Sequence, residues 1–201
     1  QLYDMEEPNT NLFDTGLHRI EVIEVDGRTL VYVLNEHDLN RSDQLWVYDE
    51  YGSPIAPALD LRQTMDIQAP TVMHVSKRDG RVYLATDLTD PNADSTVLHV
   101  LDGLSGRLLD TLPIFGIGHV TGITEDPSTG DLFVTGFMLN WVPTDEELGA
   151  GESALFDPSQ PFYEGCVAKI KREPYHVELV IDLTETCGMA LPLSLVWIEP
   201  Q

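Results

Sequence analysis

A cluster of oxygen-bearing side chains in the middle of the chain has the residue types that bind calcium. Three of its members, Asp90, Asn92 and Asp94, stand at alternating positions, and Asp87 lies nearby. Carboxylate and amide oxygens are the ligands that Ca²⁺ prefers. The spacing departs from an EF-hand loop, because Ser95 stands where that loop has glycine and Leu101 stands where it has a bidentate Glu. Two interpretations follow, a calcium site and a polar turn held by its own Asx side chains.

A long segment between two expected strands, residues 136–165, holds the second group of residues suited to binding. Its aromatic side chains are Phe137, Trp141, Phe156, Phe162 and Tyr163. Aromatic side chains offer a large contact area, and a loop of this length in a compact domain is usually functional or disordered. We expect either a surface for a ligand or protein partner, or aromatic side chains that pin the loop onto the body of the protein.

The two cysteines of the chain are Cys166 and Cys187. Cys166 opens the third expected strand of its unit and Cys187 follows the fourth. Because those strands are antiparallel neighbours, both sulfur atoms should lie at the same end of the sheet. We predict a disulfide between them, and a reduced, buried pair is the alternative.

Sequence patterns of common catalytic sites are absent. The chain contains no HExxH, no GxSxG, no Walker loop, no GxGxxG and no CxxCH. His74 and His119 lie on or beside expected inner strands, where a single histidine is either packed or functional.

Acidic residues outnumber basic ones by 34 to 11, which gives a formal charge of −23. This charge repels phosphate backbones and anionic lipid, so we expect no nucleic-acid partner. No apolar run approaches the ~20 residues that a membrane-spanning helix needs. The chain begins with Gln1 instead of Met, and we expect a processed or trimmed polypeptide at an extracellular or cell-surface location.

A strand–turn–strand unit recurs along the chain. Alternating polar and apolar residues precede Gly27, and similar units surround Gly80 and Gly130, at intervals of 53 and 50 residues. Four short antiparallel strands in a repeat of this length are typical of a propeller blade. A two-sheet sandwich would use similar strands, but it would not require the period.

We therefore predict an all-β protein, a β-propeller of about three four-stranded antiparallel blades plus the first strand of a fourth. The expected segments are a lead-in over 1–16, blades over 17–61, 70–114 and 119–184, a partial blade over 191–201, and the insertion 136–165. In a blade, the loop between the second and third strands shares a face with the link to the next blade. The insertion and the calcium-like cluster should therefore lie on one face.

One of the turns is specific enough to suggest a family. The segment Asp126-Pro127-x-x-Gly130-x-Leu132-Phe133-Val134 resembles the strand–turn–strand signature of NHL and SMP-30-like six-bladed β-propellers, and residues 79–83 are a shorter version. This resemblance implies that the chain supplies part of a larger ring. SMP-30-like enzymes hold a divalent metal in the central channel, and no ligand of that set is matched residue by residue in this chain.

We expect the protein to be a protein-binding or assembly module. The alternative is a metal-dependent enzyme, lactonase- or lyase-like, with its site at the channel mouth. Three blades and a fragment leave open flanks, so we expect other protein chains to complete or cover the ring. The apolar run 191–198 supports this expectation, and a minimal ring closed by the N-terminal segment is the alternative.

Overall fold

The computed structural model describes residues 15–25, 27–37, 43–86, 95–139 and 163–183 of the 201-residue chain. These residues form three antiparallel sheets of four strands each, and within each sheet the strands follow one another in chain order. Alternating apolar residues make the strands, as in Gln44–Asp49, where buried and partly buried side chains alternate.

Each sheet is one blade, and its strands have the following bounds. Blade 1 contains β1 (Thr15–Val25), β2 (Arg28–His37), β3 (Gln44–Asp49) and β4 (Leu59–Asp60). Blade 2 contains β5 (Pro70–Val75), β6 (Arg81–Thr86), β7 (Ser95–Asp102) and β8 (Leu108–Phe115). Blade 3 contains β9 (His119–Glu125), β10 (Leu132–Leu139), β11 (Tyr163–Arg172) and β12 (Tyr175–Asp182).

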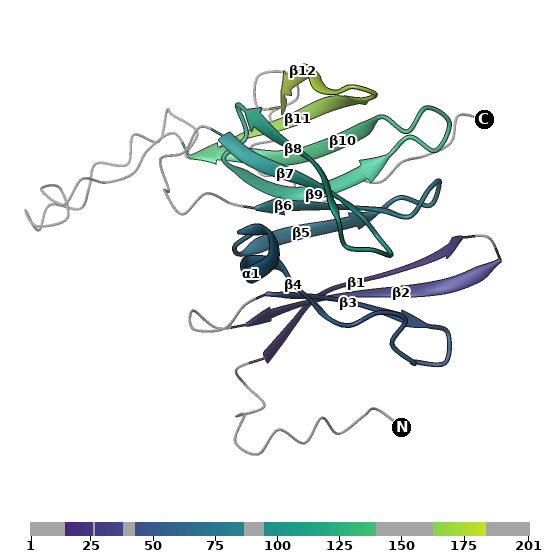
Figure 1. Cartoon of the computed structure of the whole chain (residues 1–201). Coiled ribbons are helices and arrows are strands. Elements are labelled where there is room, and N and C mark those ends of the chain that lie inside the picture. Colours follow the sequence, from purple (N-terminus) through teal and green to yellow (C-terminus); the bar gives the residue numbers. More distant parts are fainter. Residues whose placement is uncertain (1–14, 26, 38–42, 87–94, 140–162, 184–201) are drawn as a thin grey trace, which may run out of the picture.

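The three blades are stacked face to face, with their first strands side by side (Figure 1). Strand β5 contacts β1 on one side and β9 on the other. This arrangement of first strands around a common centre, with later strands farther out, is that of consecutive propeller blades. The predicted partial β-propeller is confirmed, and the expected first strand of a fourth blade lies outside the described residues.

Two apolar clusters hold the blades together. Between blades 1 and 2, Tyr32 and Leu34 pack with Val75 and Leu84 in one buried cluster. Between blades 2 and 3, the second cluster joins side chains such as Leu98 to those of blade 3, among them Val134 and Ile170. Blade 2 is therefore covered on both faces, which is the main source of stability for a stack of sheets.

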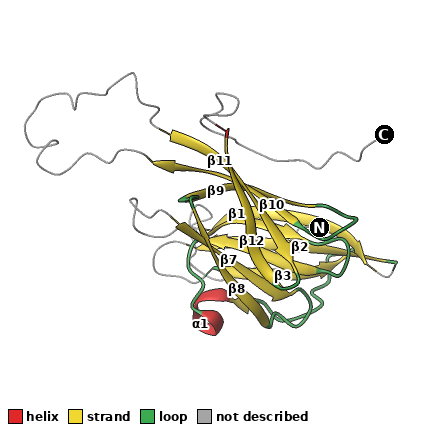
Figure 2. Cartoon of the chain, turned by 90° about the horizontal axis from the view of Figure 1, so that it is seen from above, coloured by secondary structure: helices red, strands yellow, loops and turns green. Residues whose placement is uncertain are grey.

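The fourth strand of blade 1 is shorter than expected. The sequence predicts a strand over residues 55–61, whereas the observed strand covers only Leu59–Asp60, and an isolated bridge joins Pro54 to Tyr48 of β3. Prolines at 54 and 57 remove two ladder donors, and the Asp60 side chain then accepts a hydrogen bond from the backbone N–H of Gln63 at 2.7 Å. This N-cap starts the helix α1 (Leu61–Met65), which lies at the edge of the strands (Figure 2).

The turns between first and second strands are closely similar in blades 2 and 3. In both, the residue after the first strand donates its N–H to the residue that ends the turn, from Ser76 to Arg81 and from Asp126 to Asp131. Both turns contain a glycine with positive φ, Gly80 and Gly130. The face of the propeller that carries these turns and the turns between third and fourth strands is called here the hairpin face.

Candidate functional site

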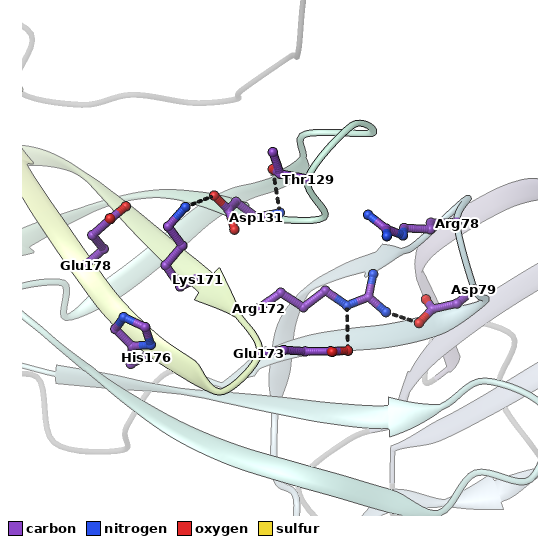
Figure 3. A pocket seen from close by; sticks show the side chains of 9 residues that line it. All are labelled: Arg78, Asp79, Thr129, Asp131, Lys171, Arg172, Glu173, His176 and Glu178. Carbon is purple, nitrogen blue, oxygen red and sulfur yellow. Dashed lines mark hydrogen bonds and ion pairs between the residues drawn. The ribbon is translucent and has the colours of Figure 1, made fainter.

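A pocket of about 640 Å³ opens on the hairpin face between blades 2 and 3. It is called here the hairpin pocket. Three hairpins supply its lining: Arg78 and Asp79 from the β5–β6 hairpin, Thr129 and Asp131 from the β9–β10 hairpin, and Lys171, Arg172, Glu173, His176 and Glu178 from the β11–β12 hairpin (Figure 3). The pocket thus exists only because the two blades lie side by side.

Arg172 is the centre of the ion-pair network beneath the pocket, with 8% of its side chain exposed. Its Nη1 lies 3.4 Å from Oε1 of Glu125, and its Nη2 donates to the Asp79 carboxylate. Its Nε lies 3.7 Å from Glu173. Because Asp79 belongs to blade 2 and Glu125 to blade 3, the guanidinium joins the two blades.

Glu125 is buried together with this guanidinium. The Ser76 hydroxyl donates to its Oε1 at 3.0 Å. Burial raises the pKa of Glu125, because a charged carboxylate loses its hydration there, while the Ser76 hydrogen bond and the positive charge of Arg172 offset part of that rise.

A second set of ion pairs lies along β11. The Nζ of Lys171 is 2.7 Å from Oδ2 of Asp131, and the Nζ of Lys169 is 3.7 Å from the same oxygen. Lys169 also contacts Glu178 at 2.7 Å. The hydrogen bond to Asp131 raises the pKa of Lys171, and the hydrogen bond from Lys169 lowers the pKa of Glu178. Lys171 and Glu178 are therefore in their charged forms near neutral pH.

Two tyrosines, Tyr83 and Tyr175, extend this ion-pair network through hydrogen bonds. Arg81 donates from Nη1 to the hydroxyl of Tyr175 at 2.7 Å, and its Nε lies 3.1 Å from Asp79. The hydroxyl of Tyr83 lies 3.2 Å from that of Tyr175. Burial raises the pKa of Tyr83, so Tyr83 acts as a neutral hydrogen-bonding group.

The charge of this region differs from that of the rest of the chain. Segments 76–81, 125–131 and 169–178 contain six of the 11 bases and six of the 34 acids. The region is therefore balanced, and the whole net charge of −23 belongs to the remaining residues.

The two inner-strand histidines are packed. Oε2 of Glu21 accepts the backbone N–H of Val75 at 2.8 Å, and its Oε1 lies 3.5 Å from Nδ1 of His74. The ring of His119 stacks on Phe137, with centroids 5.0 Å apart. In the part of the chain that the structure describes, no three His, Cys, Asp or Glu side chains are arranged to hold a metal ion.

Most residues singled out from the sequence lie outside the described residues, and the hypotheses about them stay predictions. These residues are Asp87, Asp90, Asn92, Asp94, Trp141, Phe156, Phe162 and Cys187. Phe137 is partly buried in β10, Tyr163 begins β11, and Cys166 is buried in β11.

The hairpin pocket was not predicted from the sequence. Its signal was the concentration of scarce bases in two short segments, 77–81 and 169–172, which lie about ninety residues apart in the chain.

The fold is found in solved structures, although no protein-family model and no curated protein matches the sequence. Hydrazine synthase from Kuenenia stuttgartiensis is similar with a TM-score of 0.56 and 16% identity, over 80% of this chain and 41% of that one. Acylaminoacyl peptidase from Pyrococcus horikoshii is similar with a TM-score of 0.51 and 10% identity, over 81% of this chain and 25% of that one. At these identities the likeness concerns the fold alone, and this chain spans less than half the length of either protein.

Among the described residues, no helix is long and apolar enough to span a membrane.

Proposed function

We propose that this propeller is a protein-binding or assembly module and that it binds through the face of blade 1 that points away from blade 2. This surface is called here the outward face. Two apolar rows cross it from β1 to β3, Ile20–Val33–Trp46 and Val22–Val31–Tyr48, each formed by directly paired residues. Ile20 is 50% exposed and Val22 is 56% exposed.

Comparison with blade 2 is the observation that carries the proposal. The equivalent rows of blade 2 are Met73–Leu84–His99 and Val75–Val82–Leu101. The five apolar side chains of these rows are at most 5% exposed, because blade 1 covers them, and His99 is partly buried. The outward face of blade 1 thus has the composition of a blade–blade interface, but its side chains on β1 are exposed and those on β2 and β3 are only partly buried.

The outward face also has the anatomy of an interface. Polar residues bound the apolar rows at both ends, with the pair Asn35–Gln44 at one end and Glu24–Thr29 at the other. Trp46 stacks on Tyr48, with centroids 5.9 Å apart. An apolar, aromatic centre with a polar rim is typical of protein–protein contacts. Complete burial of a Val or Ile side chain contributes about 1.5–3 kcal/mol, which favours association with another sheet.

The partner in this proposal is a blade-like β-sheet from another protein chain, which completes or covers the ring. The acidic charge of the remaining surface supports an extracellular or cell-surface location, where such a charge keeps a protein soluble. The turn at residues 126–134 supports the six-bladed NHL or SMP-30-like type.

The substitution Val22→Lys tests the proposal. A charge in the exposed β1 part of the outward face should reduce both the association of the purified protein, measured by light scattering, and the fluorescence of a bound apolar dye. Leu104→Lys is the matched control, because Leu104 is also 56% exposed but lies in the β7–β8 turn. A wild-type monomer that binds no dye and behaves like the Val22→Lys variant would contradict the proposal.

A further inference from the structure

We propose that the hairpin pocket binds a small amino-carboxylate, a zwitterion of which free amino acids are the simplest class. Its carboxylate would pair with Arg78 and its ammonium group with Glu173. This site is separate from the outward face of blade 1 and does not depend on the function proposed above.

Arg78 is the lining residue whose positive charge has no carboxylate partner within the described part of the chain. Its guanidinium makes one weak contact, from Nη1 to the backbone oxygen of Ser128 at 3.4 Å. The same Nη1 lies 3.4 Å from the position that a Cβ on Gly130 would occupy, and Nη1 of Arg172 lies 2.9 Å from that position. The two guanidinium groups therefore converge over Gly130, at the side of the pocket seen in Figure 3. A planar carboxylate is the group that an unpaired guanidinium binds best.

Glu173 is the lining carboxylate whose nearest cationic group is farthest away. Its side chain is 71% exposed, and its contacts with Arg81 and Arg172 are 3.6 Å and 3.7 Å long. Both distances exceed that of a good charge-assisted hydrogen bond. An ammonium group in the pocket can therefore bind this carboxylate without breaking a strong ion pair.

The remaining charges of the pocket have closer partners. Asp131 accepts from Lys171 at 2.7 Å, Glu178 from Lys169 at 2.7 Å, and Asp79 from Arg172. Arg78 and Glu173 are thus two groups of opposite charge, from different blades, that can each bind a charged ligand group in the same pocket. A volume of about 640 Å³ is suitable for a small molecule.

Net charge distinguishes a zwitterion from a simple anion or cation. The chain carries −23, so its overall field repels free anions. The pocket region itself holds six bases and six acids, so a simple cation is not favoured there either. A zwitterion has no net charge to be repelled, and it satisfies both underused groups at once.

The test is calorimetric titration of the full chain with glycine, β-alanine and γ-aminobutyrate, in which the two charged groups are increasingly far apart. Acetate and ethylammonium are the single-charge probes. We expect saturable binding of at least one amino-carboxylate in the millimolar range. Arg78→Gln and Glu173→Gln should each weaken it about tenfold, as expected for loss of one charge-assisted hydrogen bond.

Two matched controls separate the pocket from general charge effects. Arg107→Gln and Glu50→Gln remove exposed charges in turns of the hairpin face that do not line the pocket, and they should leave binding unchanged. Arg78 and Glu173 are both exposed, so their variants should melt like the wild type. The proposal is overturned if no amino-carboxylate binds, if acetate binds as tightly as the zwitterions, or if the pocket variants bind like the controls.

Discussion

At the scale of single residues, Gly130 determines how closely the charges of the hairpin pocket approach one another. Its φ is +78°, a conformation that glycine adopts without strain. A Cβ at this position would also lie 2.9 Å from Cδ of Arg172. The guanidinium that joins blades 2 and 3 can therefore lie against the turn only when the residue there is glycine.

Gly130→Ala should consequently destabilise the protein more than the equivalent change at a free turn. Gly27 has a φ of +71° and no atom within 4 Å of its Cβ position, so Gly27→Ala adds backbone strain alone, about 1–2 kcal/mol. In Gly130→Ala the displacement of Arg172 adds to that strain. Denaturant unfolding of both variants measures the difference. Equal losses of unfolding free energy would show that Arg172 adapts without cost.

His99 gives the stability a defined pH dependence. Burial lowers the pKa of His99, and its Nδ1 has no hydrogen-bond partner in the described structure. As pH falls through about 6.5, the ordinary pKa of histidine, His99 becomes protonated in the unfolded chain while it stays neutral in the folded chain. The unfolded state then binds more protons, so the free energy of unfolding falls with falling pH.

His99→Gln removes this contribution. Between about pH 8 and pH 6, the free energy of unfolding should decline less steeply in the variant than in the wild type. Urea unfolding at several pH values measures both slopes, and the other histidines cancel in the comparison. Identical slopes would mean that His99 titrates alike in the folded and unfolded chains.

At the scale of elements, the register of β11 and β12 places Cys166 at the end of the sheet from which the chain continues toward Cys187. Cys166 pairs with Asp182 at the end of the β11–β12 ladder, and Cys187 follows Asp182 by five residues in the sequence. A disulfide would close a loop of about 20 residues, worth about 3 kcal/mol in the chain-entropy model.

Thiol titration of the denatured, unreduced protein decides whether that bond exists. We expect no reactive thiol before reduction and two after it. Cys187→Ser should expose one thiol and lower the melting temperature. Two thiols before reduction would contradict the disulfide and support a reduced pair.

At the scale of the whole molecule, the position of a blade in the stack determines which of its faces can bind a partner. Blade 2 is buried on both faces, whereas blade 1 presents apolar rows on its outward face. The Val22→Lys experiment belongs to this scale, because it asks whether the stack associates through a flank. The amino-carboxylate experiment concerns an interior junction between blades. Failure of either therefore leaves the other proposal intact.

The repeat was predictable from the sequence because its causes are local. Alternating side chains make strands, and glycines at positions 27, 80 and 130 allow the turns. Those features lie within a few residues of one another, so they specify three blades of four strands. The short β4 and helix α1 were missed because the prolines at 54 and 57 interrupt pairing with β3 and the Asp60 side chain caps a helix through the backbone N–H of Gln63.

Only the tertiary structure determined which charges meet. Glu125 and Arg172 lie 47 residues apart in the chain, and Asp79 and Arg172 lie 93 apart. Their meeting depends on the packing angle and offset of neighbouring blades, which arise from how two apolar faces fit together. That fit is a property of many side chains at once. The sequence alone therefore determined the strands and turns, and the packing of the blades decided where the hairpin pocket lies and which residues line it.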